Sequence, residues 1–140
     1  MRILGRISLF GSKVAIEAIA SVIPHVLGSV AQVGHKRKNP DTDYWAWESE
    51  TYRFDVENLD EQLRSFVSQC AALKKPLETN RAGVRYAYLT LCPVDQTPDE
   101  LFHCVLNSAT VQAIGDLGIG VQVAPATAMP DAPAWKSARP

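Results

Sequence analysis

The chain has 140 residues, of which 46% are hydrophobic and 21% are charged, which is typical of one globular domain with a core of its own. The formal net charge of −1 argues against binding of the whole molecule to nucleic acid or to an anionic membrane. No stretch has the roughly 18–20 uncharged apolar residues of a membrane span, and the N-terminus lacks the pattern of a secretory signal.

A strand and a helix are predicted first. Residues 1–10 are rich in apolar and β-branched side chains and predict a strand, after which Gly11 turns the chain. Ser12 is a suitable N-cap for the next helix, whose apolar residues recur at helical spacing up to Ile23. Pro24 is expected to end that helix, because proline lacks the N–H and its ring clashes with the preceding turn.

Two strands are predicted in the middle of the chain. Residues 26–34 contain two glycines and are interpreted as a loop with a short extended piece. Residues 44–49 form the next predicted strand, and residues 51–56 continue it or pair with it in a hairpin. Trp45 and Trp47 are two residues apart, so their indoles share one face of the strand.

The clearest predicted element is a helix from residue 58 to about residue 75. Asn58 and Glu61 have the spacing of a capping box at its start, and Pro76 is expected to end it. Its apolar stripe comprises Leu59, Leu63, Phe66, Val67, Cys70 and Leu73.

Two more strands and a short helix are predicted next. Residues 84–91 carry apolar or aromatic bulk on both faces, which is typical of a central strand. Residues 101–106 predict another strand, a short helix capped by Asn107 or Ser108 follows, and residues 119–123 predict the last strand.

The domain organisation and fold class follow from this order of elements. Residues 1–124 are predicted to form a single α+β domain, and residues 125–140 a Pro/Ala-rich C-terminal tail with no periodicity. We expect one mostly antiparallel sheet of four to six strands, with two main helices packed on one face and a short third helix.

No combination of residues points to catalysis, a cofactor or a metal ion. The chain has three cysteines, Cys70, Cys92 and Cys104. Their odd number and wide spacing favour buried, reduced thiols in the cytoplasm. His103 precedes Cys104 directly, and neighbours on a strand point to opposite faces, so the two are not expected to form a nucleophile–base pair. Acidic residues at 41, 43, 95, 99 and 100 lie near prolines and are typical of turns and caps.

A protein-binding surface is the alternative to catalysis that the residues favour. Large aromatic side chains dominate binding energy where they are central and desolvated, and basic side chains suit the rim of such a surface. If the helices cover one side of the sheet, aromatic residues on the other side need another cover. The predicted partner-binding residues are Lys36, Arg37, Asp43, Trp45, Trp47, Tyr86 and Tyr88.

From about Met1 to Ala124 the pattern resembles a bacterial family of small single-domain α+β proteins of unknown function. The residues that carry the resemblance are Gly11-Ser12, His35 to Lys38, Trp45, Trp47, Leu59 to Leu63 and Leu117-Gly118-Ile119. The chain lacks a Lys-Gly-Asp turn that the family pattern has, which leaves the role of that loop open. Such proteins look like immunity partners of secreted toxins, so the resemblance implies binding rather than catalysis.

We therefore expect a non-enzymatic cytoplasmic binding protein, most concretely an immunity-type inhibitor of a bacterial toxin. The expected partner is a protein, with a second copy of the chain as a further candidate, and neither nucleic acid nor membrane. The alternative is a small enzyme or a small-ligand-binding domain with a pocket between the sheet and the long helix.

Overall fold

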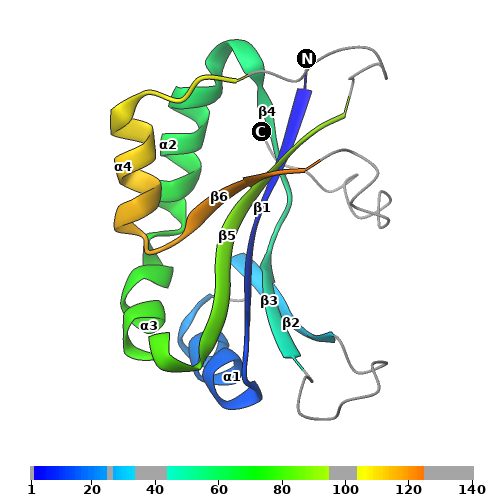
Figure 1. The fold of residues 1–140 in the computed structure, drawn as a ribbon, viewed down its shortest axis with the longest axis vertical. Helices are drawn as coiled ribbons and strands as arrows, with labels where there is room; N and C mark the ends of the chain where they lie inside the picture. Colours follow the sequence, from blue (N-terminus) through cyan, green and yellow to red (C-terminus); the bar gives the residue numbers. More distant parts are fainter. Residues whose placement is uncertain (1, 25–26, 34–43, 95–103, 125–140) are drawn as a thin grey trace.

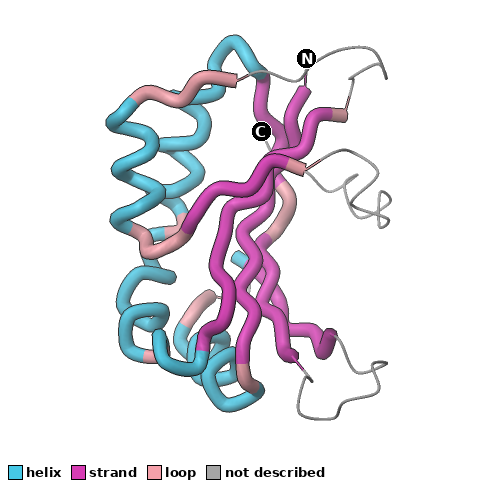
Figure 2. The backbone as a smooth tube through the Cα atoms, viewed as in Figure 1, coloured by secondary structure: helices cyan, strands magenta, loops and turns pink. Residues whose placement is uncertain are grey.

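The computed structural model describes residues 2–24, 27–33, 44–94 and 104–124, and its fold is α+β (Figure 1). Helices and strands form two layers, with the helices on one side of the sheet (Figure 2). The elements are β1 (Arg2–Gly11), α1 (Lys13–Val22), β2 (Gly28–Val33), β3 (Tyr44–Ser49), β4 (Tyr52–Asp55), α2 (Leu59–Gln69), α3 (Lys74–Thr79), β5 (Val84–Pro93), α4 (Ser108–Asp116) and β6 (Gly120–Val123).

The sheet has six strands in the order β2-β3-β1-β5-β6, with β4 also paired to β1. β3 pairs with residues 8–11 of β1 and β4 with residues 2–5, so β3 and β4 lie one after the other along the same edge of β1. All pairs are antiparallel except β5 with β6, whose connection includes α4. The predicted α+β class, the mostly antiparallel sheet and the helices on one face are confirmed.

Strand β1 divides the side chains between the two faces of the sheet. Ile3, Ile7 and Leu9 point to the helices and are fully buried in the core. Residues opposite one another in neighbouring strands share a face, so the pairing of β1 assigns the faces of its neighbours. We call the side without described helices the open face.

The apolar stripe of α2 forms the centre of the core, as its spacing predicts. The ring of Phe66 lies 4.2 Å from that of Tyr52 and 5.7 Å from that of Phe54, measured between centroids. The buried stripe residues are Leu59, Leu63, Phe66, Val67, Cys70 and Leu73.

The predicted helix from 58 to 75 is wrong in its second half. α2 ends at Gln69, a 3₁₀ turn follows, and α3 begins at Lys74. Pro76 therefore lies in the first turn of α3, where its missing N–H costs nothing because that N–H would have no helical partner. The predicted capping box is also absent, since the side chain of Asn58 makes no cap hydrogen bond.

Two further predictions are corrected. Residues 28–33 form a full strand, β2, paired with β3, and not a loop. Residues 104–106 are not a strand, while the rest of the predicted strand at 101–103 lies outside the described residues. Of the two predicted N-caps, Asn107 and Ser108, the structure has Asn107, whose side chain accepts a hydrogen bond from the N–H of Thr110 at 2.9 Å. None of the described helices is long and apolar enough to cross a membrane.

A hydrogen bond to Asp60 of α2 holds the start of α4 against α2. The Asp60 carboxylate accepts it from the backbone N–H of Asn107 at 2.8 Å. This bond, and after it a bond from the Thr110 side chain, holds the pKa of Asp60 below its usual range.

We predict that Phe66→Ala lowers the free energy of unfolding by about 3–5 kcal/mol, because it removes a large ring from a packed core and leaves a cavity. Denaturant titration measures this change. Ser65→Ala, at the exposed neighbouring position of α2, is the control and should have little effect. A loss below about 1 kcal/mol for Phe66→Ala would show that the stripe is not part of the core.

We predict that Asp60 makes stability depend on pH on the acid side. Because the pKa of Asp60 is lower in the folded than in the unfolded chain, its contribution is fully present above the unfolded value of 3.8 and is lost as pH falls through the folded value. Asp60→Asn should therefore be less stable than the wild type at neutral pH, with the difference shrinking below pH 3.8. Glu61→Gln controls for the change in net charge, and an equal effect of both variants would contradict the prediction.

Candidate functional site

The two indoles share a face, as predicted, but it is the helix-covered face. Trp47 lies opposite Leu9, and Trp45 lies opposite Gly11, on the side that packs against α1. Trp47 is only 1% exposed and belongs to the hydrophobic core. Trp47 is therefore not a surface anchor for a partner, and its replacement would act on stability.

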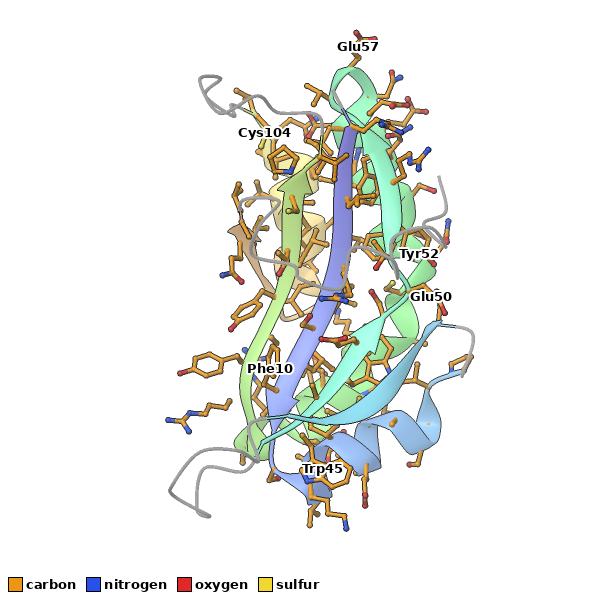
Figure 3. All side chains as sticks on the ribbon, turned by 90° about the vertical axis from the view of Figure 1, so that its right-hand side faces the viewer. Phe10, Trp45, Glu50, Tyr52, Glu57 and Cys104 are labelled. Atoms are coloured by element: carbon orange, nitrogen blue, oxygen red, sulfur yellow. The ribbon has the colours of Figure 1, made fainter. Side chains whose placement is uncertain are left out.

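Trp45 is half-buried beside α1. Its ring packs against the core, and the Lys13 ammonium lies 5.2 Å from the ring centroid (Figure 3 shows Trp45 next to this helix). This cation–π contact covers part of the indole from the solvent side. Trp45 thus connects the start of β3 with the first turn of α1.

Tyr86 and Tyr88 lie on the opposite side, on the open face. Tyr88 is paired with Ser8 and Tyr86 with Phe10 across β1, on positions that alternate with the core residues Leu89 and Leu9. The predicted single surface holding both indoles and both tyrosines is therefore wrong. Alternation along each strand places Trp45 and Trp47 on one side of the sheet and the tyrosines on the other.

Three aromatic rings form a row on the open face, which we call the aromatic row: Phe10, Tyr88 and Tyr86. The centroids of Phe10 and Tyr88 are 6.2 Å apart, and those of Tyr88 and Tyr86 are 6.1 Å apart. Tyr86 is 48% exposed, and the Arg85 guanidinium lies 5.8 Å from its ring centroid. Figure 3 looks onto this face, and Phe10 lies on the side of the sheet turned to the viewer.

An ion pair adjoins the aromatic row. Arg6 Nη1 lies 3.5 Å from Glu48 Oε2, with side chains that are 19% and 34% exposed. The buried Ser8 lies between Glu48 and Tyr88 across the strands, and the buried Thr90 lies opposite Arg6. Burial, and after it the neighbouring Tyr86, raises the pKa of Tyr88, so its hydroxyl stays protonated at neutral pH.

The predicted residues thus have different outcomes. Lys36, Arg37 and Asp43 lie outside the described residues. The open face also contains Phe10, Arg6 and Glu48, which were not among the predicted site residues. Alternation in β1 could have indicated Arg6 and Phe10, because they occupy the even positions between buried apolar residues.

The described residues offer no metal site, since no group of three or more His, Cys, Asp or Glu side chains is placed to hold an ion. The thiols are also poorly suited to catalysis. Burial raises the pKa of Cys70 to about 12 and raises that of Cys92, and burial together with the nearby Asp60 carboxylate raises that of Cys104. A nucleophilic cysteine needs the opposite shift, towards the thiolate.

Two hollows lie on the outer side of the helical layer. One of about 260 Å³ opens between α2, α3 and α4, and one of about 250 Å³ lies beside it around Leu77 and Gly118. Neither lies between the sheet and α2, where the small-ligand alternative expects its pocket. The larger hollow is lined by Arg64, Val67, Ser68, Ala71, Lys74, Ala113, Asp116 and Leu117.

We predict that the native protein resists thiol reagents. Cys70 and Cys92 are buried, with exposures of 1% and 0%, and their raised pKa values keep them as thiols at neutral pH. Titration with an aromatic disulfide should label both only after unfolding in denaturant, and the half-buried Cys104 slowly. A thiol that reacts at once in the native protein would contradict this and favour an enzyme.

No family model, curated protein or solved structure matches this chain.

Proposed function

We propose that this protein is a non-enzymatic binding domain that contacts a protein partner through the open face of its sheet. The observation that carries the proposal is the aromatic row of Phe10, Tyr88 and Tyr86 on the two central strands, with the ion pair of Arg6 and Glu48 beside it. The described helices all lie on the other side of the sheet (Figure 1).

The composition of this face fits a protein interface. Aromatic residues and arginine are enriched where proteins bind one another, and a few central aromatic side chains supply most of the binding energy. Tyr86 is 48% exposed, and a tyrosine combines a large ring with a hydroxyl that can donate a hydrogen bond. The charged neighbours Arg6 and Glu48 would favour one orientation of the partner over others.

The more specific form of the proposal is an immunity-type inhibitor that acts in the bacterial cytoplasm. It rests on the resemblance to small bacterial α+β proteins of this type, together with a candidate site that offers an aromatic surface beside an ion pair. An inhibitor of this kind needs only to occupy the toxin's active surface.

If the partner is the protein encoded by the neighbouring gene, we predict that Tyr86→Ala weakens binding to that protein by about 2 kcal/mol, or about thirtyfold in Kd. The reason is the loss of the most exposed ring of the aromatic row, at the end away from the Arg6–Glu48 ion pair. Calorimetric titration of the two purified proteins measures the effect.

Val111→Ala is the matched control, because Val111 is 53% exposed on α4, on the helix side of the molecule. Its Kd should equal that of the wild type. Equal Kd values for Tyr86→Ala and the wild type would rule out the open face, and a complete lack of binding would rule out the product of the neighbouring gene as the partner.

A further inference from the structure

The larger hollow on the outer side of the helical layer, which we call the helical hollow, has an apolar bottom and a charged rim. Val67 and Leu117 are 6% and 4% exposed and form its bottom, whereas Arg64, Lys74 and Asp116 are exposed at its rim. The helices α2, α3 and α4 that surround it lie on the side of the sheet away from the open face (Figure 1).

The helical hollow results from the break between α2 and α3 and from small side chains. At its start, α4 is held against α2 by the hydrogen bond from the N–H of Asn107 to Asp60. Nearer the end of α4, the residues on the two sides of the hollow are Ala71, in the 3₁₀ turn after α2, and Ala113. Their methyl groups are too short to fill the space between three helices.

The charge around the helical hollow favours an anion. Two cations, Arg64 and Lys74, and one acid, Asp116, belong to its lining. Within the described part of the chain, neither Arg64 nor Lys74 forms an ion pair. The Nε of Arg64 donates to the carbonyl of Asp60 at 3.4 Å, which leaves its two terminal nitrogens to bind an anion. Arg64 also interacts with the charge of Asp60, which is not part of the lining.

The size and chemistry of the helical hollow suit a small aromatic carboxylate. Its volume of about 260 Å³ exceeds the roughly 150 Å³ of an apolar cavity that binds benzene. A flat ring on Val67 and Leu117 would displace water that these side chains cannot bond. A carboxylate at the rim matches the guanidinium of Arg64 and the ammonium of Lys74.

The neighbouring hollow around Leu77 and Gly118 lacks this chemistry. Its charged residues are Glu78 and Arg81, and Arg81 Nη1 already donates to the carbonyl of Gly118 at 2.8 Å. With one acid beside one engaged cation, it does not favour an anion as the helical hollow does.

We propose that the helical hollow is a binding site for a small aromatic carboxylate, with its ring on Val67 and Leu117 and its carboxylate between Arg64 and Lys74. The site lies on the opposite side of the sheet from the aromatic row, so it does not rest on the proposed function. Ordering the Arg64 and Lys74 side chains costs conformational entropy, which limits the affinity.

Titration of the isotope-labelled full chain with sodium 2-naphthoate, followed by NMR of the amide resonances, tests the site. The largest shifts should occur at residues that line the helical hollow, with a Kd of about 1 mM, as expected of a ligand this small. The uncharged 2-naphthamide has the same rings without the carboxylate, and it should bind about tenfold more weakly.

Lys74→Glu should weaken the binding of 2-naphthoate about tenfold, because it replaces a cation at the rim by an anion. Lys75→Glu is the matched control: it makes the same change of charge at an exposed neighbour that does not line the hollow, and its Kd should stay close to that of the wild type. Ala71→Leu should abolish the shifts, because the larger side chain fills the hollow from an exposed position.

Four results would each overturn the proposal. The first is the lack of any shift around the hollow at about 10 mM 2-naphthoate, tenfold above the expected Kd. The others are equal Kd values for Lys74→Glu and Lys75→Glu, equal binding of 2-naphthoate and 2-naphthamide, and largest shifts at the aromatic row instead of the hollow. The comparison of the two probes uses the wild type, so it decides on the carboxylate even if a variant fails to fold.

Discussion

The pairing of β1 with strands on both sides is the constraint on which the rest of the structure depends. β1 contacts β3 and β4 along one edge and β5 along the other, and this register decides which side chains enter the core. Gly5 is part of this constraint, because a Cβ at that position would lie 2.5 Å from the ring of Phe54. A shift of one residue would exchange the two faces and expose Ile3, Ile7 and Leu9.

Much of the fold could be predicted because its patterns are local. The alternation in β1, the helical stripe of α2 and the cap at Asn107 each depend on residues close in sequence. The break after α2 and the strand β2 could not be predicted in the same way. Pro76 is compatible with either the end or the first turn of a helix, and β2 becomes a strand only through pairing with β3.

The candidate site was predicted only in part, for a similar reason. Period-two spacing places Trp45 and Trp47 together, and Tyr86 and Tyr88 together, but it does not say which pair the helices cover. That depends on α1 packing against β3, a contact between elements far apart in sequence. Large aromatic side chains suit a core and an interface equally well, so residue type alone does not decide between them.

The open face differs from the helix side in how firmly its side chains are held. Phe10 and Tyr88 stand on stretches of β1 and β5 that are paired along both edges, and Tyr86 stands on a stretch of β5 paired with β1. Their ring centroids are about 6 Å apart. The hollow on the helix side is bordered by the long, flexible side chains of Arg64 and Lys74. Ordering such side chains costs conformational entropy. Rings whose positions the sheet already restricts lose little conformational entropy when a partner binds. A surface of this kind favours a protein partner that packs flat against it.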